Sequence, residues 1–352
     1  MVGARLGSPE GSGQCDPWDE KFHGFLLQTR QIGMDVNRRK SAVAALSVVS
    51  NSVLVVGKLA VGLLIGSVSV LSEAIHSGVD LVAALIALFA VRTSHKPADR
   101  EHPFGHGKIE NISGTIEALL IFLAAGWIIY EAARRLRNPQ PLEAVGWGVA
   151  VMLVASLMNI IVSHQLFKVG RETDSVALEA DAWHLRTDVY TSAGVMVSLG
   201  VMLIGGKLFP HANLHWLDPA AAIAVAILII GAAWKLTIGA ARDLMDVSLP
   251  AEESQWLREY VCRPRSSVRG CHNLRTRKSG PMRFVEFHLI VDGDLSVEDS
   301  HALTDVMTRE IRERFPDSSV TIHVEPCDGR CRPECKDGCL LTEEQRLSRR
   351  TQ

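Results

Sequence analysis

The sequence Glu179-Ala180-Asp181-Ala182-Trp183-His184-Leu185-Arg186-Thr187-Asp188 decides the fold of this chain, because it opens a long apolar segment with ionisable residues. His184 and Asp188 are four residues apart in it, and on a helix this spacing places two side chains on one face, one turn apart. An earlier apolar segment repeats the spacing with His76 and Asp80. Two such faces can together offer four ligands to one metal ion.

The composition indicates a membrane domain joined to a soluble domain. Of the 352 residues, 47% are hydrophobic and only 6% aromatic, and the mean hydropathy is +0.14, which does not fit a purely soluble protein. Charged residues gather near the N-terminus, in short interruptions and after about Pro250. The net charge of -2 and the pI near 6.7 accompany no basic face or stripe, so we expect no nucleic-acid partner.

Six apolar segments are each long enough to cross a lipid bilayer as a helix, which takes about 20 residues. Lysines and arginines in the connecting loops favour the cytoplasmic side for both chain ends, despite the basic cluster at 134–137. The first residues do not read as a cleaved signal peptide, so we expect the first membrane helix to act as the insertion signal. The expected segments are 41–66, 68–93, 112–133, 143–167, 175–208 and 217–241.

We expect four regions along the chain. Ser296 and Asp299 form a weak capping signal at the start of a helix that Pro316 ends, which is typical of a small α/β domain. The order expected there is αββαβ, with helices at 251–262 and 296–315 and strands at 272–278, 283–291 and 319–325. The four regions are a cytoplasmic leader at 1–37, mobile to about residue 31, a six-helix transmembrane domain at 38–248, a cytoplasmic α/β domain at 249–326 and a cysteine-containing tail at 327–352.

The ionisable residues inside the apolar segments favour a metal site. Each costs ~2.5–3.5 kcal/mol at mid-membrane, so four oppose insertion by on the order of 10 kcal/mol unless they face one another or water. Hydrogen bonding between helices is the alternative, but it does not explain the repeated His-x3-Asp spacing. Imidazole with carboxylate in a closed set of four suits a tetrahedral divalent ion, zinc best, and leaves no open position for a catalytic water. Protons compete with metal for these ligands, which would couple metal export to proton entry.

The sequence closely resembles the cation diffusion facilitator family of divalent-metal/proton antiporters, in particular its bacterial zinc and ferrous-iron efflux branch. The resemblance extends from about Arg38 to Cys327 and rests on the joint order of the paired ligands, the motif Asp99-x2-His102-Pro-Phe-Gly-His106-Gly-Lys108 and the motif His272-Asn-Leu-Arg-Thr-Arg. It implies a metallochaperone-like cytoplasmic domain and a homodimer in the bacterial inner membrane, with both termini cytoplasmic. It also implies export of Zn2+ from the cytosol by alternating access, with His76, Asp80, His184 and Asp188 as the transport site.

One departure from the branch bears on the substrate. Its members often carry Asp at the position of His76. Imidazole in place of a hard carboxylate moves the preference from manganese or iron towards zinc. We therefore expect Zn2+, with Cd2+ and Fe2+ left open and Co2+ or Ni2+ as further alternatives.

Two further metal sites follow from the resemblance. Asp99, His102 and His106 could belong to a solvated, charged loop, but the resemblance implies a peripheral metal site there. The histidines of the α/β domain could each be an ordinary polar residue; the resemblance instead implies a paired zinc site between two cytoplasmic domains, with Glu325 as the acidic ligand. The resemblance likewise implies an ion pair of Lys108 with Asp246 between the third and sixth helices, where a snorkelling lysine is an equal alternative. The histidines are His272, His288, His301 and His323.

The soluble part of the chain after about Pro250 contains six cysteines, and we expect its thiols to be reduced in the cytosol. Four of them lie in the tail at intervals of four residues. A loop could wrap the four thiolates around a zinc ion, while a disordered tail is the other interpretation. Two other function classes also stay open, a membrane metallohydrolase and a membrane-bound metal sensor. The sequence contains no His-Glu-x2-His motif, which disfavours the hydrolase. The four tail cysteines are Cys327, Cys331, Cys335 and Cys339.

Overall fold

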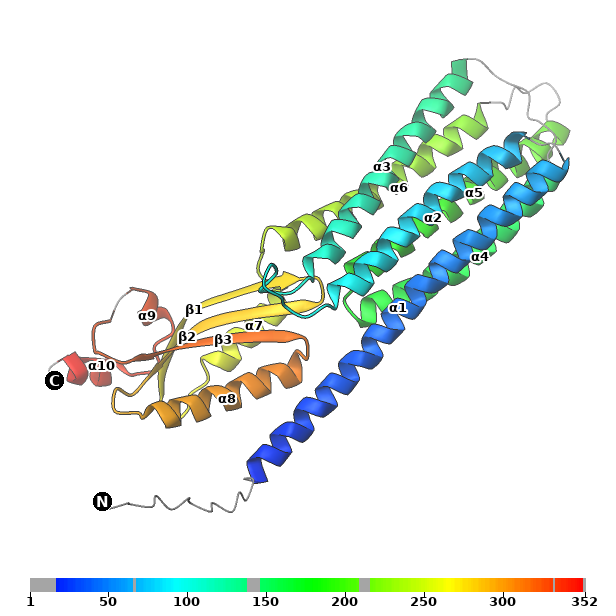
Figure 1. Cartoon of the computed structure of the whole chain (residues 1–352). Helices are drawn as coiled ribbons and strands as arrows, with labels where there is room; N and C mark the ends of the chain where they lie inside the picture. The colour runs from blue at the N-terminus through cyan, green and yellow to red at the C-terminus, as the bar shows by residue number, and fades with distance from the viewer. Residues whose placement is uncertain (1–16, 66–67, 138–145, 209–215, 332, 351–352) are drawn as a thin grey trace, which may run out of the picture.

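The computed structural model describes residues 17–65, 68–137, 146–208, 216–331 and 333–350. In it a bundle of long helices stands at one end of a small α/β domain (Figure 1). The predicted architecture, a polytopic helical membrane domain followed by an α/β domain, is confirmed. The bundle helices are α1 Pro17–Ile65, α2 Val68–Ser94, α3 Lys108–Arg137, α4 Gly146–Glu172, α5 Val176–Leu208 and α6 Leu217–Leu244.

Five of these helices contain segments that are long and apolar enough to cross a bilayer, as judged over the described residues. They are α1, α2, α3, α4 and α6. α5 contains the stretch Glu179–Asp188, whose charged side chains lower the hydropathy of its first half.

The first helix is longer than the sequence pattern predicts. The expected mobile leader is wrong from Pro17 onwards, because 17–31 form the start of α1, while residues 1–16 lie outside the described part of the chain. Proline is well tolerated at the first helical position, and no further proline occurs between Pro17 and Pro97 to interrupt the helix.

The helices pack in three close pairs, α1 with α2, α3 with α6 and α4 with α5. At the end nearest the α/β domain, Lys40 Nζ of α1 lies 2.8 Å from Glu110 Oε1 of α3, and both side chains are buried. The hydroxyl of Ser94 donates to the same carboxylate at 2.7 Å. Because removing one partner leaves an uncompensated buried charge, we expect breaking this ion pair to cost ~3–5 kcal/mol.

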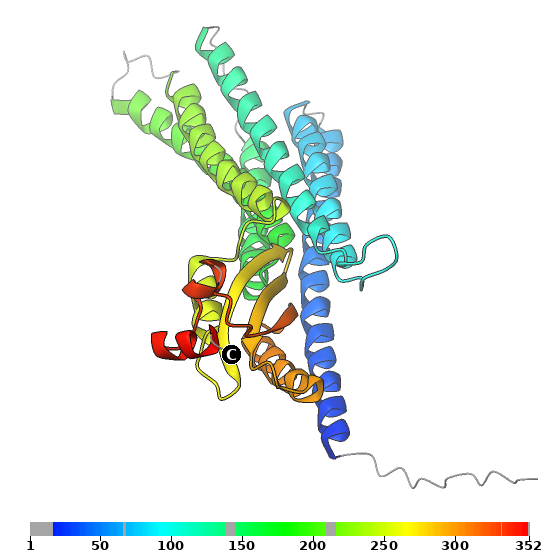
Figure 2. The same ribbon diagram turned by 90° about the vertical axis from the view of Figure 1, so that its left-hand side faces the viewer.

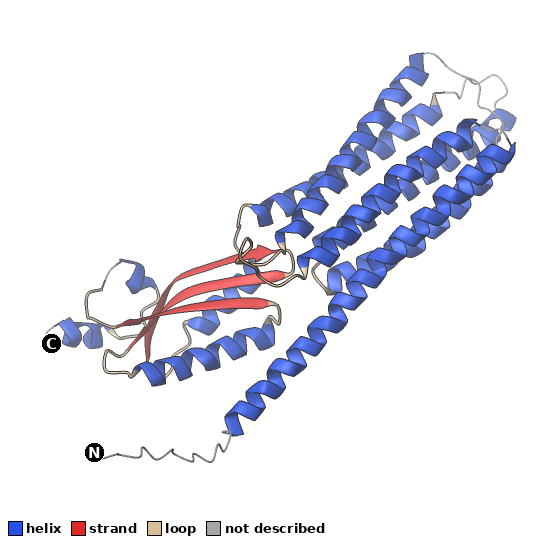
Figure 3. Ribbon diagram, viewed as in Figure 1, coloured by secondary structure: helices blue, strands red, loops and turns tan. Residues whose placement is uncertain are grey.

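The α/β domain has the predicted order of elements, α7 Ala251–Val261, β1 Val268–Ser279, β2 Met282–Val291, α8 Val297–Arg314 and β3 Ser318–Pro326. The three strands form one sheet in the order β1-β2-β3, with β1 antiparallel and β3 parallel to β2 (Figure 3). The first strand begins at Val268 rather than at His272. The predicted cap is confirmed, since Ser296 Oγ accepts a hydrogen bond from the backbone N–H of Asp299 at 3.0 Å.

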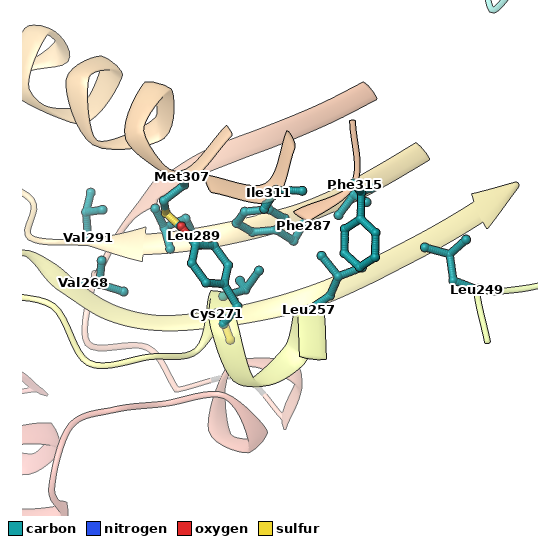
Figure 4. Packing of buried hydrophobic residues seen from close by; sticks show 13 residues of the cluster. Leu249, Leu257, Val268, Cys271, Phe287, Leu289, Val291, Met307, Ile311 and Phe315 are labelled. Atoms are coloured by element: carbon teal, nitrogen blue, oxygen red, sulfur yellow. The ribbon is translucent and has the colours of Figure 1, made fainter. Parts of the chain in front are cut away.

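The core of this domain lies between one face of the sheet and the two helices (Figure 4). Phe287 and Leu289 of β2 are buried there with Leu257 of α7 and Ile311 of α8. Successive side chains of a strand point to opposite faces. The residue between them, His288, therefore points away from the helices, and this leaves a polar face on the other side of the sheet.

The turn between β1 and β2 attaches the α/β domain to the bundle. The backbone N–H of Gly280 donates to Asn111 Oδ1 of α3 at 2.9 Å. A side chain at Gly107 would collide with the backbone of Ser279, so glycine is needed for this close approach. Lys108 Nζ lies 2.9 Å from Asp246 Oδ1, which confirms the ion pair expected next to α3 and α6.

The cysteines and the tail differ from expectation in two respects. Cys262 and Cys271 form a disulfide, with Cα atoms 5.4 Å apart, so the prediction of reduced thiols is wrong for this pair. The chain reverses direction between α7 and β1, and this reversal brings the two residues within disulfide range. The tail is ordered over its described residues: it forms α9 Pro333–Asp337 and α10 Glu343–Arg350.

Candidate metal sites

The four residues proposed for transport meet between α2 and α5. His184 Nε2 lies 3.2 Å from Asp80 Oδ1, and His76 Nε2 lies 3.9 Å from Asp188 Oδ1. Each close pair thus joins the histidine of one helix to the aspartate of the other. Local helix geometry explains this, because residues four apart project from the same face of each helix.

Three of the four residues form a group compact enough for one ion. Ligand atoms of His76, Asp80 and Asp188 all lie within 4.8 Å of one another. His184 joins the group through its contact with Asp80. The cluster is asymmetric, because the side chains of His184 and Asp80 are each 6% exposed, whereas His76 is 52% exposed and Asp188 21%.

A cavity of about 590 Å3 contains the cluster and is lined by residues from all six helices of the bundle. Lys58 of α1 reaches into it and donates a hydrogen bond to Ser77 Oγ at 2.8 Å, next to His76. Lys58 was not among the expected site residues, although a lysine within the apolar segment 41–66 is costly to insert. Asn159 of α4 also lines the cavity.

Two buried carboxylates were also given no role in the sequence analysis. Asp181 lies one turn before His184 on α5, and Glu117 lies on α3; both are completely buried. The hydroxyl of Ser113 donates a hydrogen bond to Glu117 Oε1 at 3.3 Å. An ionisable residue inside a membrane span costs free energy unless it has a partner or a function. The apolar segments around Asp181 and Glu117 therefore already suggest that these two residues face a polar site.

The loop between α2 and α3 brings its three expected ligands together. Asp99 Oδ1 lies 3.2 Å from His102 Nδ1, and Asp99 Oδ2 lies 3.3 Å from His106 Nε2. Gly105 adopts a φ of 82°, which lets the loop turn sharply between the two histidines. A hydrogen bond from the backbone N–H of His102 lowers the pKa of the Asp99 carboxyl and so keeps it ionised and able to bind metal.

Strand register builds the cluster on the polar face of the sheet. His288 on β2 is paired with His272 on β1 and with His323 on β3, so three histidines lie in a row across the sheet. His272 Nε2 lies 3.2 Å from His288 Nδ1. Glu325, two residues after His323, therefore lies on the same face.

Glu325 is the centre of this cytoplasmic histidine cluster. Its carboxylate oxygens lie 2.8 Å from His288 Nδ1, 3.4 Å from His272 Nε2 and 3.5 Å from His323 Nε2. The structure does not bring His301 to the cluster. That residue lies on α8, which packs on the other face of the sheet, and its Nε2 is 3.6 Å from Asp305 Oδ2.

Comparison with protein families assigns both parts of the chain. Residues 44–245 match the family described as cation efflux transmembrane domain. Residues 249–327 match the family described as cation efflux protein, cytoplasmic domain. Together the two matches cover most of the sequence and leave the tail after residue 327 outside them.

Individual proteins match over most of their length. The cation-efflux pump FieF of Klebsiella pneumoniae subsp. pneumoniae is 35% identical over 288 residues, which is 82% of this chain and 92% of that protein. The uncharacterized transporter sll1263 of Synechocystis sp. is 36% identical over 263 residues, 75% of this chain and 83% of that protein. A solved structure of the putative zinc transporter CzrB, in its Zn form, is 42% identical in sequence. The match covers 24% of this chain and 97% of the solved chain, with a TM-score of 0.22.

Proposed function

This chain belongs to the cation diffusion facilitator family, and from that premise we propose that it exports Zn2+ from the cytosol in exchange for protons, as a homodimer. It is a multi-pass membrane protein and a cation efflux transporter, not an enzyme. Family membership therefore disfavours the metallohydrolase and a sensor without transport. The proposal adds three statements to family membership: zinc is the transported ion, its export is coupled to protons, and the protein acts as a dimer.

The observation that carries the proposal is the cluster between α2 and α5. His76, Asp80 and Asp188 offer ligand atoms within 4.8 Å of one another, and His184 lies 3.2 Å from Asp80. Two carboxylates balance the charge of one divalent ion. Two imidazoles favour zinc over the harder ions that prefer oxygen ligands only. Cd2+, Fe2+, Co2+ and Ni2+ are the competitors to test against it.

Proton coupling follows from the chemistry of the same ligands. Carboxylate and imidazole bind metal only when they are deprotonated, so each proton taken up weakens the hold on the ion. We propose that zinc from the cytosol first reaches the buried half, Asp80 and His184, which lies about one helical turn nearer the α/β domain than the exposed half, His76 and Asp188. Protonation of these groups in the outward-facing state then releases the ion.

The cytoplasmic histidine cluster and the loop fit supporting roles. The cluster of His272, His288, His323 and Glu325 lies on a sheet face that α7 and α8 leave open. We propose that it binds zinc at the contact between two copies, and that Asp99, His102 and His106 bind a peripheral ion. His301 has no place in this site within one chain. We also propose that the chain is divided into the four regions 1–37, 38–248, 249–326 and 327–352, with both termini in the cytoplasm.

Zinc flux into proteoliposomes under an imposed pH gradient tests the function. We expect the parent protein to move zinc faster when the gradient is present, and Asp188→Asn to abolish the flux. His164→Ala is the matched control, because His164 is an exposed histidine of α4 that does not line the cavity. Undiminished flux in Asp188→Asn would refute the transport site, whereas flux that ignores the gradient would refute only the proton coupling.

A further inference from the structure

The tail at 327–352 contains four cysteines, and the last three of them lie beyond both family matches. Each is separated from the next by three residues. Structural zinc sites commonly use two to four residues between consecutive cysteine ligands, so every interval lies in that range. The four thiols, Cys327, Cys331, Cys335 and Cys339, are free and partly buried.

The fold gathers these cysteines around one space. A cavity of about 590 Å3 in the α/β domain is lined by all four of them. The same cavity is lined by His272, His288 and Glu325 of the cytoplasmic histidine cluster.

Backbone contacts fix both ends of the cysteine segment to the sheet. At its start, the N–H of Cys327 donates to the carbonyl of Val291 at 2.8 Å. At its end, the N–H of Cys271 donates to the carbonyl of Gly338 at 3.0 Å, and the N–H of Leu340 donates to the carbonyl of Arg269 at 2.9 Å. A side chain at Gly338 would collide with the backbone of Cys271, so only glycine permits this approach.

Three arginines border the thiols, beside the carboxylates of Glu325 and Asp328, and Arg269 is also paired with Asp292. Arg269, Arg330 and Arg346 line the cavity together with the four cysteines. The Nε of Arg346 is buried and has no hydrogen-bond partner among the described residues. A divalent ion bound by four thiolates has a net charge of 2-, which guanidinium groups at the rim can offset and to which a buried N–H can donate.

We propose that Cys327, Cys331, Cys335 and Cys339 form a thiolate site for a thiophilic divalent cation such as Zn2+ or Cd2+, next to the cytoplasmic histidine cluster. Thiolates are the ligand type that such ions prefer, and the spacing, the shared cavity and the arginines each fit that chemistry. An ion there would fix α9 and α10 beside the edge of β1. The site does not depend on zinc being the transported ion.

Cobalt spectroscopy on the purified full-length protein in reductant tests the site. Co2+ bound by thiolates gives a charge-transfer absorption that histidine and carboxylate sites lack. We expect this band in the parent protein, in Cys15→Ser, which removes a thiol outside the tail, and in the double variant His272→Ala/His288→Ala. The double variant Cys335→Ser/Cys339→Ser should lose the band and bind one zinc fewer per chain. A parent without the band, or a cysteine double variant that keeps it, would overturn the proposal.

A second measurement does not depend on the folding of a variant. Thiols of the reduced parent protein are counted by alkylation, with and without Zn2+. Zinc should protect four thiols per chain, and mass spectrometry should place them in the tail. If zinc leaves the alkylation of these four unchanged, no thiolate site forms and the proposal fails.

Discussion

The transmembrane cluster and the cytoplasmic histidine cluster use the same ligand types on different scaffolds. The first takes His76 and Asp80 from α2 and His184 and Asp188 from α5, and the two residues on each helix are four positions apart. The second takes one histidine from each of three strands, in register across the sheet. Helix spacing therefore sets the first cluster locally, whereas the second exists only once the strands have paired.

The clusters also differ in charge and exposure. The transmembrane cluster has two carboxylates for two imidazoles, while the cytoplasmic one has the single carboxylate of Glu325 for three imidazoles. An ion that two carboxylates neutralise can be exchanged for protons on those same groups. The difference fits our proposal that the first cluster moves metal and the second holds it.

The largest expected effect comes from the buried half of the transmembrane cluster. Asp80→Asn removes a ligand and also the partner of His184. Mutation of a group that only supports a metal ligand typically costs ~10–100-fold, so we expect zinc flux in proteoliposomes to fall by more than about 100-fold. Asp305→Asn, which changes an exposed carboxylate of α8, is the control and should leave the flux unchanged. Flux in Asp80→Asn within a few fold of the parent would remove the distinction between the clusters.

A smaller effect is expected from changing ligand type in the exposed half. His76→Asp replaces imidazole with a harder carboxylate and should move the preference from Zn2+ towards Fe2+. We expect the ratio of zinc to iron flux to fall by about tenfold, which corresponds to ~1.4 kcal/mol. The ratio is measured under anaerobic conditions in the parent and the variant side by side. An unchanged ratio would mean that this residue does not set the selectivity.

The cytoplasmic histidine cluster should affect transport only indirectly. Glu325→Gln removes the carboxylate that contacts all three histidines, so zinc bound to the cytoplasmic domain should decrease on elemental analysis. We expect zinc flux to fall only about fivefold, the lower end of allosteric coupling between sites. Complete loss of flux in a folded variant would place this cluster in the transport path and contradict the division of roles.

The smallest effect is expected at His301. It is 76% exposed on the helical side of the domain, where Asp305 is its neighbour. His301→Ala should therefore leave the zinc content of a single chain unchanged in elemental analysis. His323→Ala is the matched comparison, since the same substitution on β3 removes a residue that contacts Glu325. If the His301 variant lost as much zinc as the His323 variant, His301 would have to be a zinc ligand, which would contradict its position in the structure.

Local patterns predicted much of the fold. The helices α2 to α6 follow apolar segments, and the αββαβ order follows from capping, proline and alternation near Ser296, Pro316 and 283–291. The start of α1 was not predictable in the same way, because 17–31 have mixed polarity and no apolar run. The disulfide of Cys262 with Cys271 depends on how the chain turns between α7 and β1, which spacing does not reveal.

Prediction of the sites follows the same division. The repeated spacing of four residues was enough to predict that His76, Asp80, His184 and Asp188 form one site. In the sheet, family resemblance named the histidines, but only the register of β1, β2 and β3 separates His323 from His301. Lys58 was missed because a sequence pattern does not specify which face of α1 borders the cavity.

The pH inside proteoliposomes after external zinc is added tests most directly whether zinc and protons share the transmembrane cluster. If zinc enters in exchange for protons, the lumen becomes more alkaline in the parent protein and in Glu325→Gln, and its pH stays constant in Asp80→Asn. Zinc entry without any change of luminal pH in the parent, or an alkaline shift that survives in Asp80→Asn and disappears in Glu325→Gln, would contradict the account.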